Sequence, residues 1–173
     1  VRPHQVAREI AQLVTAGSAE KGPRVGSEAN NSALVAVDPV LSGLVEELVL
    51  LGVSAVTASV EAVRTLPHVF AGVTGALCAV AETGTVVVGP GRATEGLLAV
   101  LPQLHVVVLP AERIKPDLAS ALAELAPLAA QPGTRLAFIT GPSRTADIEL
   151  TTVLGVHGPL DLAVIVVVPE RIG

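Results

Sequence analysis

The stretch that decides the fold is ALVAVDPVLSGLVEELVLLGVSAVT, residues 33–57. It opens on a short apolar run that predicts a strand. Asp38 and Pro39 then favour the start of a helix, because an aspartate can cap the first free amides and proline suits the first turn. We expect this helix to end at Gly52, before a second strand over 53–57. A strand, a helix and a strand in this order predict a βαβ unit of a parallel sheet.

The rest of the chain continues this alternation of apolar runs and helical patterns. Strands are expected at 33–37, 69–73, 77–81, 86–88, 105–109, 136–139 and 163–168, and further helices at 3–16, 60–66 and 114–128. The hydrophobic half of the composition is nearly all Ala, Val and Leu, with two Phe and no Tyr or Trp. Such residues suit strands that are covered on both faces. We therefore predict an α/β fold with a mainly parallel sheet and flanking helices.

The length and the net charge of the chain limit the number of domains and the kinds of partner that we expect. A chain of 173 residues fits one α/β domain over 33–173, preceded at 1–32 by a helix and a Gly- and Asn-rich flexible loop. The net charge of −5 without a basic cluster argues against a nucleic-acid partner. The longest apolar run, 162–168, is far shorter than the ~20 residues of a membrane span. With no charged leader at the start, we expect a soluble cytoplasmic protein; the lack of any Met indicates that the chain is trimmed or lacks residues.

The segment Gly141–Glu149 combines turn formers, hydroxyls, one cation and two carboxylates directly after an apolar run. If a helix begins near Thr145, the free amides of its first turn favour an anion, and Arg144 can pair with a carboxylate or phosphate. Alternatively, Ser143 or Thr145 caps that helix, and Asp147 is simply stabilised in its first turn by the helix dipole. Both interpretations stay open on spacing alone.

A second polar segment, Glu82-Thr83-Gly84-Thr85, lies just before an expected strand. A glycine beside two hydroxyls permits a close approach of the backbone to a ligand. The alternative is a tight turn that only opens the strand. Arg92 follows a Gly-Pro-Gly turn and is either an anion-binding residue or a solvated loop charge. These segments are therefore candidates for a binding site rather than proof of one.

Histidine and cysteine give weaker signals. His157, in the turn-rich segment 155–159, and His105, at the start of a strand, can each act near neutral pH as acid, base or ligand. A structural role is favoured for His105, whereas His157 is equally open to both. No His-x-His or His-Glu-x-x-His spacing predicts a metal site. The single Cys78 can form neither an internal disulfide nor a cluster site, and we expect it to be a small buried hydrophobic residue.

Three blocks in combination, 81–85, 101–105 and 141–149 with the nearby 155–159, carry a resemblance to a known family. Over about 73–168 the chain resembles the lactate-utilisation (LUD) domain family, and within it the small C-type subunit without an iron–sulfur cluster. The resemblance implies a fold like that of sugar-phosphate isomerases and CoA transferases. One departure is Leu77-Cys78, where many members carry a polar or acidic residue.

The resemblance implies a non-redox subunit that works beside two iron–sulfur proteins in oxidising L-lactate to pyruvate. Such a subunit would hold no cofactor of its own, the clusters would lie in its partners, and it would bind a small anion or a partner protein. The residues that match the family motifs as ligand-binding candidates are Thr83, Gly84, Thr85, Arg92, Ser143, Arg144, Thr145 and Asp147. Glu82 and His157 are the candidate proton carriers.

Two other functions remain compatible with the sequence. One is a stand-alone transferase or isomerase that uses Glu82 as nucleophile or base; the other is a structural scaffold whose matched residues only shape turns. If the segments serve one site, they must meet in a shared cleft. Ligands in open α/β sheets lie outside the carboxyl ends of the strands, and we expect 140–145 and 155–159 to form loops there.

Overall fold

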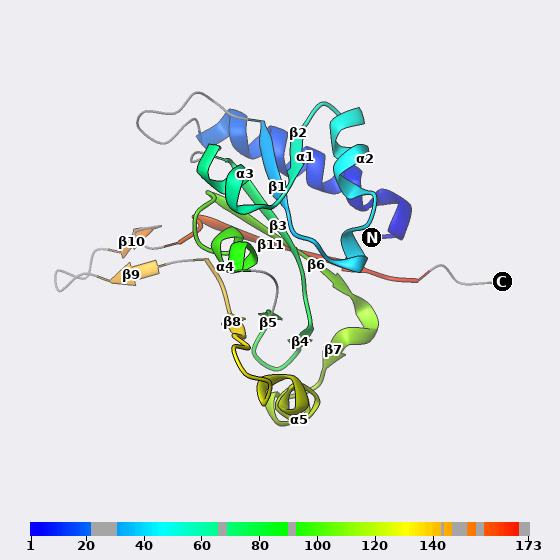
Figure 1. Ribbon diagram of the computed structural model, residues 1–173, viewed down its shortest axis with the longest axis vertical. Coiled ribbons are helices and arrows are strands. Elements are labelled where there is room, and N and C mark those ends of the chain that lie inside the picture. Colours follow the sequence, from blue (N-terminus) through cyan, green and yellow to red (C-terminus); the bar gives the residue numbers. More distant parts are fainter. Residues whose placement is uncertain are drawn as a thin grey trace.

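The computed structural model describes residues 1–21, 31–65, 69–89, 93–142, 144–146, 152–154 and 158–169. Its centre is a five-stranded parallel sheet (Figure 1). The strands are β1 (Ser32–Val35), β2 (Ser54–Thr57), β3 (Ala71–Gly75), β6 (Leu104–Pro110) and β11 (Asp161–Val167), in the spatial order β11-β6-β3-β1-β2. All four adjacent pairs are parallel. The predicted α/β fold with a mainly parallel sheet is confirmed.

The βαβ unit at 33–57 forms as predicted, but its helix is broken. The Asp38 carboxylate accepts a hydrogen bond from the amide of Val40 at 2.8 Å and caps a short 3₁₀ helix, Pro39–Leu41. Gly43 then takes a φ of 77°, a conformation that ends a helix, and α2 (Leu44–Leu50) starts anew. The prediction of one continuous helix was therefore wrong, although Gly52, with a φ of 84°, ends α2 as expected.

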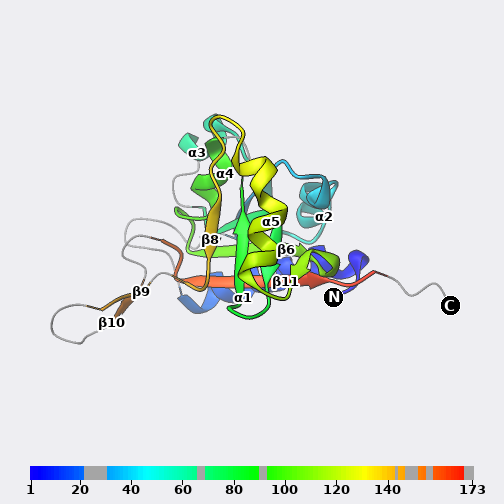
Figure 2. The same cartoon turned by 90° about the horizontal axis from the view of Figure 1, so that it is seen from below.

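Helix α1 (Val6–Lys21) follows a 3₁₀ turn, Pro3–Gln5, and extends beyond the predicted end at residue 16. Its residues Ile10 and Val14 are fully buried and belong to the same hydrophobic cluster as Val106 of β6 and Leu48 of α2. Figure 2 shows α1 on one side of β6 and β11 and α4 (Ala93–Leu98) on the other. No helix in the described ranges is both long and apolar enough to cross a membrane.

A second, smaller sheet covers the other face, and the sequence did not predict it. It contains β4 (Cys78–Val80), β5 (Thr85–Val88), β7 (Ile114–Lys115) and β8 (Ala137–Ile139) in the order β7-β4-β5-β8. Strand β5 is antiparallel to both of its neighbours. Val86 and Val88 pack against Val107 and Leu109 of β6, so the two sheets share one hydrophobic layer. Helix α3 (Val60–Thr65) lies beside α4 (Figure 1), and its residues Ala62 and Val63 pack against the main hydrophobic core.

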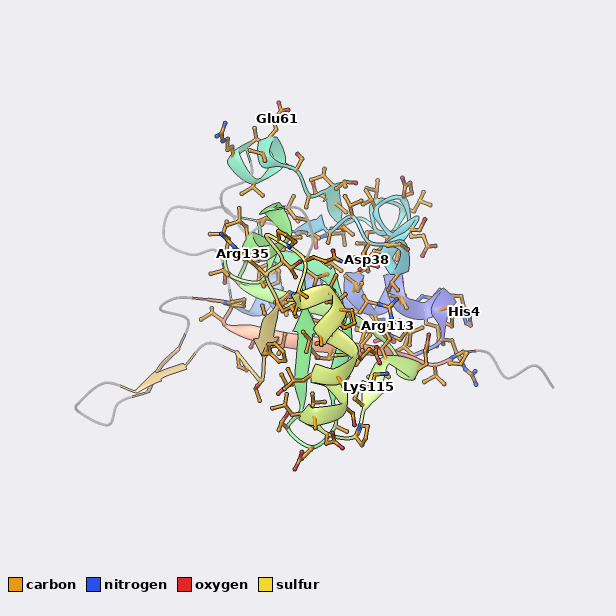
Figure 3. All side chains as sticks on the ribbon, turned by 60° about the horizontal axis from the view of Figure 1, so that its bottom comes forward. His4, Asp38, Glu61, Arg113, Lys115 and Arg135 are labelled. Atoms are coloured by element: carbon orange, nitrogen blue, oxygen red, sulfur yellow. The ribbon has the colours of Figure 1, made fainter. Side chains whose placement is uncertain are left out.

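Helix α5 (Leu118–Ala129) forms an outer layer against the second sheet. Its residues Ala121 and Leu125 pack on Val87 and Cys78, so Cys78 is a buried hydrophobic residue as predicted. The predicted helix start at 114 was wrong, because the Asp117 side chain caps the helix by accepting from the Ser120 amide. Lys115, which belongs to β7, instead forms an ion pair with Glu124 of α5 (Figure 3).

Candidate functional site

Threonine hydroxyls join two of the predicted segments. The hydroxyl oxygen of Thr83 lies 2.7 Å from that of Thr85, which in turn lies 2.9 Å from that of Thr140. Thr85 begins β5 and Thr140 follows β8, and these strands are antiparallel neighbours. The pairing therefore places the Glu-Thr-Gly-Thr turn beside the start of the Gly141 segment. Thr140 was not among the predicted site residues, and only its position beside Gly141 could have pointed to it.

The Glu-Thr-Gly-Thr segment is a tight turn between β4 and β5. Gly84 has a φ of 65°, which accounts for glycine at this position. Glu82, Thr83 and Gly84 are exposed, whereas Thr85 is buried. The amide of Glu82 donates to the carbonyl of Pro116, so the backbone of the turn is fixed while the Glu82 carboxylate faces solvent. The turn interpretation thus holds for the backbone, and it leaves the exposed polar groups available to a ligand.

A cavity of about 170 Å³ lies between the main sheet and the loops around it. Its lining consists of Ala99, His105, Ile139, Gly141, Pro142, Gly158, Pro159 and Leu162. The described parts of the 141–149 and 155–159 segments therefore face one shared space, although they lie far apart in the sequence. The Glu82–Thr85 turn does not line this space. Among the described residues, Thr140, the neighbour of Ile139 and Gly141, connects the turn to the cavity wall.

The cavity lies at the amino ends of the parallel strands, and the expected placement at their carboxyl ends was wrong. Gly158 and Pro159 precede β11 rather than follow a strand. The carbonyl of Gln103, just before β6, accepts from the amides of Leu160 and Asp161 and holds the start of β11 in place. Thr140 follows β8, which is not a strand of the parallel sheet but pairs antiparallel with β5 in the second sheet. The error arose because a short apolar run does not show which sheet it joins.

His105 is the buried polar residue of the cavity wall, with only 1% of its surface exposed. Its Nε2 atom lies 2.9 Å from the hydroxyl of Thr74, on the neighbouring strand β3. Its Nδ1 atom is buried without a hydrogen-bond partner in the part of the chain that the structure describes. Burial lowers the pKa of His105 from 6.5 to about 4, so the ring is neutral near pH 7. The sequence favoured a structural histidine here, and only its place within a run of valines hinted at this environment.

The Gly141–Glu149 segment begins differently from the predicted helix. Arg144, Thr145 and Ala146 form strand β9 (Arg144–Ala146), which pairs with β10 (Thr152–Leu154) in an antiparallel two-stranded sheet. A helix that begins near Thr145 is therefore wrong, and so is the anion site built on its first amides. The predicted site residues Arg92, Ser143, Asp147 and His157 lie outside the described residues. For Arg144 and Thr145 only the backbone is described.

Comparison with known proteins identifies the family of this fold. The family model described as the LUD domain matches residues 9–167, which is most of the chain. The chain belongs to the LUD domain family. The match includes most of α1 as well as the two larger sheets, so the family model covers the N-terminal helix together with the α/β domain.

Individual relatives agree with this assignment. A protein of Halalkalibacterium halodurans named lactate utilization protein C is 39% identical over 100 residues, which are 56% of this chain and 43% of the relative. A protein of the same name from Deinococcus radiodurans is 38% identical over 96 residues, 54% of this chain and 44% of the relative. The matched regions thus span less than half the length of these relatives.

A solved structure supports the fold of the LUD domain. The crystal structure of a DUF162 family protein from Deinococcus radiodurans superposes with a TM-score of 0.54 and covers 91% of this chain and 83% of its own. The sequences are 22% identical in that superposition. At this identity the likeness establishes the shared architecture.

A second cavity of this LUD domain, about 280 Å³, opens at the carboxyl ends of β6 and β11. Val108, Pro110 and Val167 line it from the sheet, and Glu47 and Glu112 are its acidic residues. Of the predicted site residues that the structure describes, none lines this second cavity. Within the described ranges, no three His, Cys, Asp or Glu side chains lie together as metal ligands would.

The lowered pKa of His105 predicts a pH-dependent stability. The unfolded chain binds a proton at His105 below pH 6.5, whereas the folded protein binds it only near pH 4. Between about pH 7 and about pH 5, this difference should lower the free energy of unfolding by about 2 kcal/mol. Urea unfolding of the wild type and of His105→Gln at both pH values measures it. The variant should lose about 2 kcal/mol less on acidification, and equal losses would contradict the prediction.

Proposed function

We propose that this LUD-domain chain is a non-redox component of an L-lactate-oxidising complex, in which it binds a small anion or a partner protein. The observation that carries the proposal is the family match over 9–167, together with the relatives named lactate utilization protein C. Oxidation of L-lactate to pyruvate removes two electrons and two protons. In the proposed complex the electrons pass to iron–sulfur partners, and this chain contributes binding and positioning.

The geometry supports a binding role for the described segments. The three threonine hydroxyls at 83, 85 and 140 form a polar row beside the wall of the cavity that Gly141 and Gly158 line. We assign the charge for an anion to Arg92 and Arg144, because guanidinium groups bind carboxylates through two parallel hydrogen bonds. Ser143, Thr145 and Asp147 belong to the same proposed site, with Glu82 and His157 as its proton carriers.

The cysteine content supports placing the redox centres elsewhere. Cys78 is the single cysteine of the sequence, and four thiolates are the usual ligands of an iron–sulfur cluster. Its side chain, on β4, is fully buried against α5, and burial raises the pKa of the thiol. A buried thiol with a raised pKa is a poor metal ligand and a poor nucleophile. The iron–sulfur clusters of the proposed complex therefore belong to its partner subunits.

Reconstitution tests the proposal. The purified chain should be colourless and should not reduce a dye with L-lactate, since it lacks a cluster site and a Gly-x-Gly-x-x-Gly dinucleotide fingerprint. Mixing it with candidate cysteine-rich iron–sulfur partner proteins should give lactate-dependent dye reduction. The matched control is the same mixture without this chain, which should be inactive. A flavin or iron–sulfur absorption band that persists in the purified chain, or equal activity in the control, would overturn the proposal.

A further inference from the structure

Helix α5 has an apolar flank that no other element covers in the described part of the chain. Its inner side packs on the second sheet through Ala121 and Leu125. Leu118 and Leu122, one turn apart, are 42% and 48% exposed. The exposed alanines of the helix are Ala119, Ala123, Ala126 and Ala129. A helix that is apolar around most of its circumference is normally covered by protein, so this flank indicates an interface.

The charged residue of α5 lies on the opposite flank of the helix. Glu124 forms an ion pair with Lys115 of β7, at one edge of the second sheet. Leu122 lies about 160° around the helix from Glu124, and therefore faces β8 at the other edge. Phe138 of β8 pairs with Val87, whose side chain packs against α5, and Phe138 is 43% exposed. Together with the exposed Leu and Ala side chains of α5, Phe138 forms one apolar surface, the α5–β8 patch.

The spacing of side chains along this flank fits a second copy of the same helix. Residues 119, 122, 126 and 129 follow one another at intervals of three and four, the spacing along which two helices pack closely. If two helices pair antiparallel about a two-fold axis level with residue 124, Leu122 of each copy lies opposite Ala126 of the other. Ala119 lies opposite Ala129 in the same way. Each leucine thus meets a small residue, and one surface is complementary to itself, as a two-fold interface requires.

The distribution of charge also favours a second copy. The chain has a net charge of −5, so two copies repel each other unless the surfaces that meet are uncharged. The α5–β8 patch meets this condition, because Glu124 lies on the other flank and is neutralised by Lys115. A partner that docks through its own charges finds no opposite charge on this patch. An uncharged, self-complementary surface is therefore better suited to a copy of the chain than to a charged protein.

We propose that the α5–β8 patch is a homodimer interface, in which α5 packs antiparallel against α5 of a second copy. Leu122 packs beside Ala126 of the other copy, and Phe138 lies at the edge of the contact. A pair of 12-residue helices, each about 18 Å long, makes a smaller contact than the standard interface of roughly 800 Å² per partner. We therefore expect a dimer that dissociates in the micromolar range. This interface does not depend on the proposed role in lactate oxidation.

Sedimentation equilibrium of the chain from ~1 μM to ~200 μM measures the association directly. We expect mostly monomer at the lower end and twice the monomer mass of 17.5 kDa at the upper end. Leu122→Lys places two charges in the contact and should keep the chain monomeric throughout. The matched control is Leu50→Lys, because Leu50 is 86% exposed on α2 and lies outside the patch. It should leave dimerisation unchanged, and the melting temperature of each monomer confirms that it is folded.

A size swap tests the antiparallel arrangement itself. Ala126→Leu sets two leucines against each other and should weaken the dimer roughly tenfold, although it enlarges the apolar surface. Non-specific association of apolar surfaces would instead become stronger. Adding Leu122→Ala to this variant again places a large residue opposite a small one, and it should restore the dimer.

A chain that stays monomeric at the highest concentration would overturn the inference, and so would a dimer that Leu122→Lys leaves intact. If the chain is monomeric but Leu122→Lys abolishes dye reduction by the reconstituted complex while Leu50→Lys does not, the patch binds a partner protein instead of a second copy. If Ala126→Leu strengthens the dimer, or the double variant fails to restore it, the antiparallel pairing of α5 is wrong.

Discussion

Replacing Gly72 by Val is expected to lower the free energy of unfolding by at least about 3 kcal/mol, the upper range for overpacking a core. Gly72 lies in β3, the central strand of the main sheet. A Cβ atom there would overlap the carbonyl oxygen of Leu98 and would lie 2.9 Å from Cγ of Pro102. Because the obstacle includes backbone at the end of α4, it cannot rotate away. Valine adds two further carbons, so either α4 or the strand must move.

Gly96→Ala is the matched control, because Gly96 lies in α4, the helix that packs against Gly72. Nothing lies within 4 Å of a Cβ atom at Gly96, and the residue is exposed. Alanine should therefore stabilise α4 slightly, by up to ~1 kcal/mol, because glycine is a poor helix former. Urea unfolding of both variants and the wild type gives the comparison. A Gly72→Val protein as stable as the wild type would show that α4 does not pack on β3 as described.

Local chemistry made part of this fold predictable. The helical segment after β1 is capped by Asp38, has Pro39 in its first turn and ends at Gly52. Each of these effects acts over a few residues, so it can be read from the sequence. The single break at Gly43 was missed because a glycine within a helical pattern is also tolerated inside helices. The apolar run around Val106 predicted a buried strand correctly, since a strand covered on both faces needs no polar positions.

The second sheet depends on contacts between residues far apart in the chain, and local patterns do not reveal these. Val86 and Phe138 gave short apolar runs, but only the pairing of β5 with β8 shows that they leave the parallel sheet. The same limit explains why the cavity was expected at the carboxyl ends of the parallel strands and lies at their amino ends. The segment around Gly158 was correctly read as a loop. It lies at the amino end of the sheet because the strand that follows it, β11, belongs to the main sheet.

The candidate site was predictable in its segments and not in its contacts. Thr85 was named from its motif, but its partner Thr140 could be found only once β5 and β8 were seen to pair. His105 had the weakest signal of all, a single histidine in an apolar strand, for which a structural role is the more common outcome. Its unmet Nδ1 is a property of the packed core, and no spacing in the sequence encodes it.

Arg144→Ala is expected to reduce lactate-dependent dye reduction by the reconstituted complex roughly a hundredfold. The expectation rests on the proposed anion site, where a bidentate, charge-assisted contact is worth about 3 kcal/mol. If Arg144 binds the anion at the surface as proposed, the fold should tolerate the change to within about 0.5 kcal/mol, the usual range for a surface substitution. Arg144 pairs with Leu154 in the β9–β10 ladder through backbone atoms, which the substitution leaves in place.

Two further variants separate charge from geometry at Arg144. Arg144→Lys keeps the positive charge but loses the planar fork, so it should recover only part of the activity. Arg135→Ala removes an exposed arginine just before β8 (Figure 3) and should leave both activity and stability unchanged. Initial rates at saturating partner concentration and melting temperatures measure the two effects. If Arg144→Ala strongly lowers the melting temperature while the activity per folded molecule stays the same, Arg144 supports the fold and does not bind the anion. Removing a ligand contact would instead lower the rate and leave the melting temperature unchanged.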